Sequence, residues 1–357
     1  MSRLTTLTRK LRVESHDALL VTSRTNIRYL SGFSGTNGFL LVRVDGSAIV
    51  VTDPRYAERV VDELRDETDL DVQIVAPPLW DHLPGLVTEA SSIALEAEHL
   101  NWAKAREIAD QLGADRCHAT HGYVEAQREQ KDDEELAHIR KACKVADSAF
   151  TAVVENMRPG RTERDVAWAF AEAVHRCGGD GVAYEPIVAS GPNASRPHHA
   201  TGSRVLQAGD LVIVDAGAMV TGYRSDMTRS FVLGEPTAQQ RELLDAVAVA
   251  QVDGLAAVRA GSPASDVDAA CRSSLESAGL AEWFTHGTGH GVGLDIHEAP
   301  WVLATATGTL APGQVITVEP GVYLPGVGGV RWEDMVLVTA TGSEALTHTP
   351  KQPVIDL

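Results

Sequence analysis

The sequence predicts an α+β protein of two domains, a smaller N-terminal α/β domain and a larger C-terminal domain made of two related halves. Its 357 residues are long for one hydrophobic core and suit two. A charged stretch at residues 128–135 interrupts the pattern of helices and strands, and the chain beyond it partly repeats itself. We therefore expect domains at residues 1–128 and 129–357.

The composition indicates a globular protein and excludes several function classes. The net charge of −18 argues against binding to nucleic acid or to acidic membranes, and it suits a site that attracts cations. The N-terminus lacks the apolar core of a signal peptide, and no apolar run reaches transmembrane length. The four cysteines, Cys117, Cys143, Cys177 and Cys271, lie far apart without a CxxC pair, which predicts free, buried thiols in a cytoplasmic protein.

The N-terminal domain is expected to alternate strands and helices. Strands are predicted at residues 18–22, 39–44, 48–52 and 72–75, and helices at residues 54–64 and 102–112. Asp45-Gly46 is a strong hairpin signal between the second and third strands. Residues 25–30 are expected to lead into a glycine-rich loop at residues 32–38. This loop lacks the Lys-Ser/Thr ending of a phosphate-binding loop, which favours an ordinary loop.

The charged stretch at residues 128–135 is expected to be solvated and to supply acidic residues to the first turn of the next helix. That helix is predicted at residues 134–157, where apolar residues recur at the spacing of a buried stripe. These residues are Leu136, Ile139, Ala142, Cys143 and Ala146. Residues 237–240 have the form of a capping box at the start of a second long helix.

An internal repeat links two segments of the C-terminal domain. Residues 158–169 resemble residues 259–270, and each copy follows a long helix and begins another. Farther on, residues 209–217 match residues 313–321, and each copy is followed by a second acid. The match is short and gapped, so chance similarity stays open. If it is real, two half-domains pack about a pseudo-twofold axis, and each half brings two carboxylates to that axis.

Four acidic residues lie in apolar, strand-like surroundings where an unpaired charge is costly. Asp215 ends an apolar strand, and Asp226 is expected on the next strand, so a hairpin would place the two side by side. Glu319 and Glu333 are expected to do the same in the second half. Several carboxylates that reach two metal ions at once are what a two-metal site needs.

A glycine-rich segment, residues 286–293, supplies the candidate nitrogen ligand. In His286-Gly-Thr-Gly-His290-Gly-Val-Gly, glycine takes every second position. In an extended chain, both histidines would face a cavity while another element packs closely against the bare backbone. His290 would then complete the ligand set.

Each of these residues has an ordinary interpretation when it is taken alone. A strand aspartate is more often a turn or cap residue, and a lone histidine is more often structural. The five together, in this order and these contexts, predict a dinuclear metal site at Asp215, Asp226, His290, Glu319 and Glu333. Oxygen ligands with one imidazole favour manganese first, with cobalt or zinc as alternatives.

At these residues the sequence closely resembles the M24 metallopeptidases of the pita-bread fold, which include methionine aminopeptidase, aminopeptidase P, prolidase and creatinase. The five predicted ligands fall on the family pattern Asp, Asp, His, Glu, Glu. Residues 26–38 and 52–56 resemble the creatinase/prolidase type of N-terminal domain. The resemblance implies a pita-bread catalytic domain at residues 129–357 and a creatinase-like domain at residues 1–128.

The resemblance also implies roles for the remaining residues. His198 and His297 match the two catalytic histidines, and Glu319 would act as general base. His286 and Arg331 match residues that line the proline pocket, and Tyr184 is a weaker candidate for the same pocket. Structural, hydrogen-bonded roles are the alternative for these histidines and for Arg331.

The implied activity is that of an Xaa-Pro aminopeptidase acting on small proline-containing peptides. Residues 32–38 and 52–56 look more like aminopeptidase P relatives, which sets this activity ahead of an Xaa-Pro dipeptidase. A catalytically inactive binding protein of the same fold is the alternative from another class, although such relatives have lost ligands that this chain keeps. A homodimer is expected from the family alone, and no nucleic-acid or membrane partner is expected.

Overall fold

A computed structural model describes residues 2–64 and 70–357 of the chain. The chain divides into two compact units, Met1–Arg128 and Glu129–Leu357. Both units mix helices and strands, which confirms the predicted α+β class. Within the described residues, no helix combines the length and the apolar character that a bilayer crossing needs.

The N-terminal unit is built on a six-stranded sheet of order β4-β3-β2-β1-β5-β6. Its strands are β1 Ala18–Val21, β2 Gly38–Arg43, β3 Ala48–Thr52, β4 Leu70–Ile74, β5 Ile93–Glu96 and β6 Cys117–Thr120. Its helices are α1 Arg3–Val13, α2 Arg24–Ser31, α3 Ala57–Glu63, α4 Leu83–Leu86, α5 Trp102–Leu112 and α6 Glu125–Arg128. Leu20 and Leu41 pack with Ile108 of α5 in one core cluster. Leu19 and Leu40 are also buried and face the other way, because successive strand residues alternate, so the sheet is covered on both faces.

The hairpin of β2 and β3 and helix α5 lie where the sequence predicts them. Helix α2 lies in the segment that leads into the glycine loop, for which no helix or strand was predicted. The Ser23 hydroxyl caps its first turn by accepting from the Asn26 amide, and Gly32 ends it in the left-handed region at φ 79°. Helix α1 and the short strands β5 and β6 were not predicted, because their few apolar residues give little periodicity.

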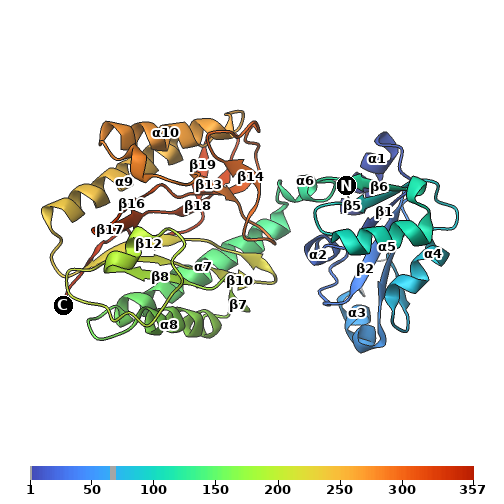
Figure 1. Cartoon of the computed structure of the whole chain (residues 1–357), viewed down its shortest axis with the longest axis horizontal. Coiled ribbons are helices and arrows are strands. Elements are labelled where there is room, and N and C mark those ends of the chain that lie inside the picture. The colour runs from blue at the N-terminus through green and yellow to red at the C-terminus, as the bar shows by residue number, and fades with distance from the viewer. Residues whose placement is uncertain (1, 65–69) are drawn as a thin grey trace. The chain divides into compact units, whose positions relative to one another are not determined.

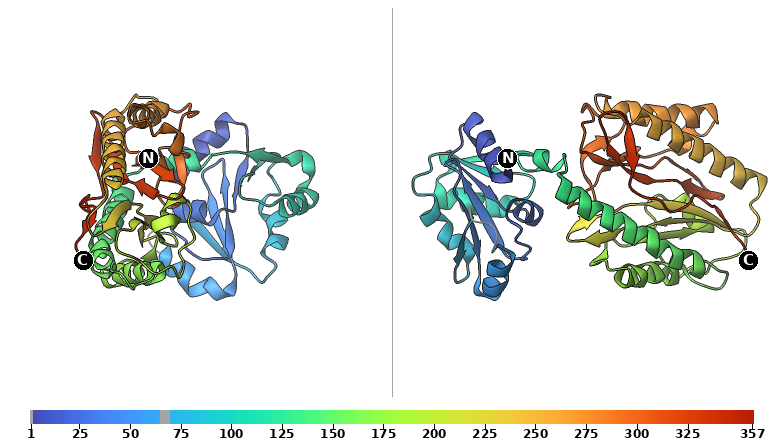
Figure 2. Two further views of the ribbon diagram at one scale, coloured as in Figure 1. Left: turned by 60° about the vertical axis from the view of Figure 1, so that its left-hand side comes forward. Right: turned by 180° about the vertical axis from the view of Figure 1, so that it is seen from behind.

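The C-terminal unit contains two pairs of helices on opposite sides of its strands. The pairs are α7 Asp133–Asn156 with α8 Glu163–Arg176, and α9 Ala238–Ala257 with α10 Ala264–Ser277. In Figure 1, α7 and α8 lie below the strands of this unit and α9 and α10 lie above them, and both views of Figure 2 agree. The capping boxes that start α7 and α9 satisfy backbone amides that would otherwise lack partners.

The strands of this unit repeat in the same order in each half, which confirms the predicted repeat. In the first half, β9 pairs with β8 on one side and β12 on the other, and in the second half β15 pairs with β13 and β18. The first set is β8 Ile187–Ser190, β9 Leu211–Asp215 and β12 Thr228–Leu233, with β20 Val354–Ile355 at its edge. The second set is β13 Gly289–Gly291, β15 Val315–Val318 and β18 Asp334–Val338, with β14 Glu298–Val302 and β19 Ser343–Ala345 at its edges.

Each half contains one long hairpin that is interrupted part-way. The outer parts are β10 Ala218–Val220 with β11 Tyr223–Arg224, and β16 Gly321–Leu324 with β17 Gly328–Arg331. Asp215 ends β9, and Glu319 directly follows β15. Asp226 and Glu333 were predicted within strands, but they lie in the breaks before β12 and β18. The acidic residues therefore gather where the strands are interrupted.

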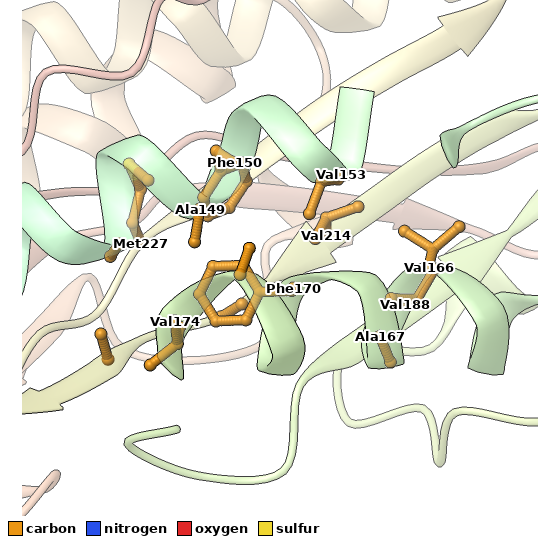
Figure 3. Close-up of a cluster of buried hydrophobic side chains, with 14 of the residues drawn as sticks. Ala149, Phe150, Val153, Val166, Ala167, Phe170, Val174, Val188, Val214 and Met227 are labelled. Carbon is orange, nitrogen blue, oxygen red and sulfur yellow. The ribbon is translucent and has the colours of Figure 1, made fainter. Parts of the chain in front are cut away.

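Two hydrophobic clusters support the halves. In the first, Phe150 of α7 and Phe170 of α8 meet edge to face with ring centroids 5.5 Å apart. Figure 3 shows these rings between the two helices, with Val188 and Val214 of the sheet close by. Burial of each such ring contributes about 1.5–3 kcal/mol.

Two expectations about exposure were wrong in part. Arg128, Lys131 and Glu135 of the charged stretch are buried rather than solvated. Lys131 pairs with Glu298 at 2.8 Å, and Glu135 closes the capping box of α7, so both of these buried charges have a partner.

All four cysteines have free thiols, and Cys143 and Cys271 are buried as expected. Cys177 is exposed, because it lies at the C-terminal end of α8, and Cys117 is of intermediate exposure.

Candidate metal centre

All residues predicted for the site line one cavity of about 350 Å³ in the C-terminal unit. They come from both halves of this unit. The set consists of Tyr184, His198, Asp215, Asp226, His286, His290, His297, Glu319, Arg331 and Glu333. Residues as far apart in the sequence as 184 and 333 therefore share one space.

Three of the predicted ligands converge most closely. One donor atom each from Asp226, His290 and Glu333 lies within 4.8 Å of the other two. The Nε2 atom of His290 lies 3.6 Å from an Asp226 oxygen and 3.5 Å from a Glu319 oxygen. Both halves thus supply donors to the same point.

The glycines of β13 explain how His290 reaches this point. A Cβ atom at Gly289 would lie 2.1 Å from the Thr317 carbonyl oxygen, and one at Gly291 would lie 2.2 Å from the Ala299 carbonyl oxygen. Only glycine lets β13 lie this close to its neighbours. The Nδ1 atom of His290 lies 3.0 Å from the Gly291 carbonyl oxygen, so Nδ1 carries the proton and Nε2 keeps a lone pair for a metal.

The electrostatics of the cavity fit a site for cations. Burial raises the pKa of the Asp226, Glu319 and Glu333 carboxyl groups well above their usual values, and the neighbouring carboxylates raise it further. Burial also lowers the pKa of His290 to about 4, which keeps its imidazole neutral. Three crowded acids and one neutral imidazole form the donor set that a divalent pair requires.

Asp215, the remaining predicted ligand, is held from two sides. Its Oδ2 atom accepts from Arg331 at 2.6 Å, and its Oδ1 atom accepts from the Tyr184 hydroxyl. The same hydroxyl is also within hydrogen-bonding reach of Asp226, and its single proton serves one of the two carboxylates at a time. Burial and the adjacent Asp215 raise the pKa of Tyr184 well above its usual value, so it stays a neutral donor. Tyr184 therefore orients two ligand carboxylates in addition to lining the cavity.

A polar cluster closes one end of the cavity around Tyr323, a residue that sequence reasoning missed. The Tyr323 hydroxyl accepts from Arg331 at 2.8 Å and lies 2.9 Å from Nε2 of His286. Burial and the nearby Arg331 charge lower the pKa of His286 to about 3, so this imidazole is neutral at neutral pH. Tyr323 lies on β16, and no pattern in the sequence marked it as a site residue.

Two threonines, also missed, orient the ligand glutamates. Thr228 donates to Glu333 at 2.7 Å, and Thr317 donates to Glu319 at 3.3 Å. Thr317 lies two residues from Glu319 along β15, so strand alternation places both side chains on one face. This spacing was the available signal for Thr317.

The two predicted catalytic histidines lie at the open side of the cavity. His297 is exposed, and its ring centroid lies 4.3 Å from that of His290. His198 is exposed and follows the short 3-10 helix Gly191–Ser195. Neither histidine side chain is buried in the hydrophobic core, so both can face a bound molecule.

Two family models match the chain. Residues 137–340 match metallopeptidase family M24, and residues 3–130 match the creatinase/prolidase N-terminal domain. The chain belongs to metallopeptidase family M24. The resemblance inferred from the sequence is thus confirmed, and so is the pita-bread fold with a creatinase-like N-terminal domain. The chain is an enzyme, and M24 metallopeptidases use divalent metals.

Individual relatives match over nearly the whole chain. The Xaa-Pro dipeptidase of Pyrococcus horikoshii is 31% identical over 95% of this chain and 94% of its own. The structure of an Xaa-Pro dipeptidase from Bacillus anthracis superposes with a TM-score of 0.95 at 32% identity, and 99% of each chain is covered. That of an X-Pro aminopeptidase from Thermotoga maritima has a TM-score of 0.89 at 31% identity, covering 98% of this chain and 100% of that one.

Proposed function

We propose that this enzyme is a dinuclear metal-dependent Xaa-Pro dipeptidase that hydrolyses the bond between an N-terminal residue and a C-terminal proline. The observation that carries this proposal is that one cavity joins the acidic ligand cluster to a buried cation, Arg331, and a neutral imidazole, His286. The sequence alone ranked the aminopeptidase first. The names of the Pyrococcus and Bacillus relatives favour the reverse order.

The bond to proline explains why such a cavity is useful. The imide nitrogen carries no hydrogen, so an enzyme cannot recognise this bond through an N–H donor. Recognition must use the ring and the carboxylate beyond it. His286 supplies a neutral surface for the ring, and Arg331 supplies a fixed positive charge for the carboxylate.

The ligand residues would be Asp215, Asp226, His290, Glu319 and Glu333. Two divalent ions held there supply charge stabilisation and an activated water. Glu319 lies beside His290 and acts as the base that accepts the proton. His198 donates a hydrogen bond to the scissile carbonyl, and His297 stabilises the negative charge that develops on its oxygen.

The test compares Leu-Pro, Leu-Pro-amide, Leu-Pro-Gly and Leu-Ala as substrates. Chelated protein is assayed alone and after addition of Mn²⁺, Co²⁺ or Zn²⁺, and Mn²⁺ is expected to restore the highest rate. We expect kcat/KM for Leu-Pro to exceed that for the amide and the tripeptide at least about tenfold, since both lose the carboxylate next to proline. Equal or faster cleavage of Leu-Pro-Gly would reverse the order of the two activities.

The second candidate, an Xaa-Pro aminopeptidase, is supported by the similarity to the Thermotoga structure and by residues 32–38 and 52–56. An inactive binding protein is disfavoured because the chain keeps all five ligand residues. A rate that does not depend on added metal would favour it. A cytoplasmic location, inferred from the spacing of the cysteines, and a homodimer, expected from the family resemblance, belong to the same proposal.

A further inference from the structure

A fully buried carboxylate outside the cavity gathers five hydrogen bonds from one segment of chain. Glu163, the first residue of α8, has no exposed surface. Its Oε1 atom accepts from the Ser190 amide at 2.9 Å, the Ser190 hydroxyl at 2.8 Å and the Asn193 side chain at 2.9 Å. Its Oε2 atom accepts from His199 at 2.8 Å and from the Gly202 amide at 3.2 Å.

All of these donors belong to residues 190–202, the segment that carries His198. After Ser190 this segment forms a short 3-10 helix and then runs on without strand pairing. It therefore lacks the backbone ladder that fixes His290 in β13. Other contacts also hold it. Thr201 accepts from the Val188 amide and donates to the Pro186 carbonyl, each at 2.8 Å, and the Gly202 carbonyl accepts from the Arg164 amide at 3.1 Å.

Neighbouring side chains of the segment have opposite environments. His199 reaches Glu163, whereas His198 is exposed and lines the cavity. His198 ends a turn at residues 197–198 and is bonded directly to His199, so the two side chains leave adjacent backbone positions. Fixing His199 and Gly202 on one side of the segment therefore fixes where His198 projects on the other.

Glu163 is suited to this role at neutral pH. Burial opposes its ionisation, but hydrogen bonds from Asn193, His199 and Ser190 outweigh burial and lower its pKa. Its place in the first turn of α8 adds the favourable field of a helix N-terminus. A carboxylate that is held ionised can accept every one of the five bonds.

We propose that Glu163 is a positioning residue that holds the segment bearing His198 in place for catalysis. The inference rests on the proposed function for the role of His198. Glu163 touches no substrate, because it lies behind the segment and does not line the cavity. Its effect must therefore pass through His198.

The substitution Glu163→Gln tests the proposal, because a glutamine has one oxygen and an NH₂ group. In either orientation, the NH₂ group faces at least one backbone amide that needs an acceptor, that of Ser190 or that of Gly202. We expect kcat for Leu-Pro to fall about 100-fold, the cost of a misplaced catalytic group. KM and the Mn²⁺ affinity measured by calorimetry should stay within about threefold, since the metal ligands are untouched.

A matched control lies on the same helical turn. The Asp165 carboxylate also accepts a hydrogen bond at the start of α8, but from the Thr162 amide and not from the segment at 190–202. Asp165→Asn should lower stability while leaving kcat unchanged. His199→Ala removes one donor and keeps the carboxylate, so it serves as a second variant if Glu163→Gln folds poorly, and it should lower kcat less.

A double-mutant cycle separates positioning from general destabilisation. In a His198→Ala background, Glu163→Gln should lower kcat no further, because the group it positions is already gone. Losses that multiply in the double variant would overturn the inference. So would a Glu163→Gln or His199→Ala enzyme that keeps full kcat.

Hydrogen exchange keeps the test independent of the proposed activity. The amide of Ser190 or that of Gly202, whichever faces the NH₂ group, should exchange at least about tenfold faster in Glu163→Gln than in Asp165→Asn, because only the first variant removes its acceptor. Unchanged exchange overturns the inference even if the enzyme cleaves Leu-Pro. Faster exchange in a protein that cleaves no proline dipeptide would instead reject the proposed function and support the role of Glu163 in holding the segment at residues 190–202.

Discussion

The two halves of the C-terminal unit share one plan and fill it with different residues. Each half has two helices, three paired strands and an interrupted hairpin in the same order. The first half contributes Asp215 and Asp226 to the cavity, and the second contributes Glu319 and Glu333. The second half also supplies the imidazole of His290, the proposed nitrogen ligand. The shared arrangement of helices and strands therefore determines where the acids lie, and the individual residues determine what each half contributes to the cavity.

The acidic side chains that hold the histidine-bearing segments in place also differ between the two halves. The first half uses Glu163, whereas the second uses Asp268 of α10, which accepts from Thr288 at 2.9 Å and from Arg272 at 2.7 Å. Arg272 in turn donates to the carbonyl of His286 at 2.5 Å. At the offset of the repeat, the counterpart of each anchor is an alanine, Ala264 or Ala167. Each half thus acquired its own means of fixing a histidine.

The largest expected effect comes from removing one ligand in each half. Asp226→Ala and Glu333→Ala should each lower activity about 10⁴-fold, since the metal ions supply several kcal/mol of charge stabilisation. Calorimetry should show fewer or no bound Mn²⁺ ions. Because these carboxylates repel one another when no metal is bound, the chelated variants should resist urea better than the chelated parent. A variant that loses one half's ligand and stays fully active would contradict the shared site.

Next in size is a cavity in the first half's core. Phe170→Ala removes a fully buried ring that contacts Phe150, and it should cost about 3–5 kcal/mol of unfolding free energy. At the offset of the repeat, the counterpart of Phe170 is Cys271, a much smaller side chain. Cys271→Ala should therefore cost clearly less. Urea unfolding of the two variants measures the difference, and equal losses would show that the helix pairs are packed alike.

Substitutions of the histidines in the two halves should have smaller effects on activity, and the kinetic constant that changes should differ between the halves. His198→Ala should lower kcat about 100-fold, as removal of one transition-state donor does. His286→Ala should instead raise KM for Leu-Pro about tenfold with little change in kcat, because it removes contacts made equally before and during reaction. Steady-state kinetics with saturating Mn²⁺ distinguishes the two. A fall in kcat alone for His286→Ala would place it in the chemistry.

The close packing of α9 and α10 gives a fourth comparison. A Cβ atom at Gly254 would lie 2.4 Å from the Cys271 sulfur and 3.0 Å from a Val318 methyl group. Gly254→Ala should therefore destabilise the protein by about 1 kcal/mol, since overpacking outweighs the gain in helix propensity. In a Cys271→Ala background the same change should be neutral or stabilising. Persistent destabilisation there would point to a cause other than this sulfur.

The smallest expected effect is a pH dependence. The lowered pKa of Glu163 lies below the value of about 4.3 for a glutamate in an unfolded chain. Its ionisation thus stabilises the fold above about pH 4.3, and this contribution is lost as the pH falls through the lower folded value. The stability gap between chelated parent and Glu163→Gln should shrink as the pH falls from 6 to 3. A constant gap would mean that Glu163 is not ionised in the fold.

Regular patterns made much of this fold predictable from the sequence. Alternating and apolar runs marked β1 to β4, and the 3–4 spacing marked α7, because burial of one face imposes those periods. Helix α1 and strand β6 carry weaker patterns and were missed. The exposure of Cys177 depends on which side of α8 faces solvent, which its neighbours in the sequence do not specify.

The cavity residues that could be predicted are those whose side chains are chemically unusual in their sequence surroundings. Acids in apolar runs and the glycines around His290 are conspicuous because both lower the stability of a fold unless they serve a function. Tyr323 and Thr228 look ordinary in the sequence, and only the fold brings them to Arg331 and Glu333. The position of Asp226 in a break rather than a strand likewise depends on tertiary contacts.

The division of the ligands between the halves also bears on how the protein unfolds. A chain with one half unfolded would keep only a single pair of acids at the centre, with or without the imidazole of His290, and these are too few to retain both ions. At the proposed site, metal would therefore bind only when both halves are folded, and its binding energy would add to the cooperativity of unfolding. Bound metal would link the two halves reversibly. The concentration of divalent ions would therefore set how much the folding of one half stabilises the other.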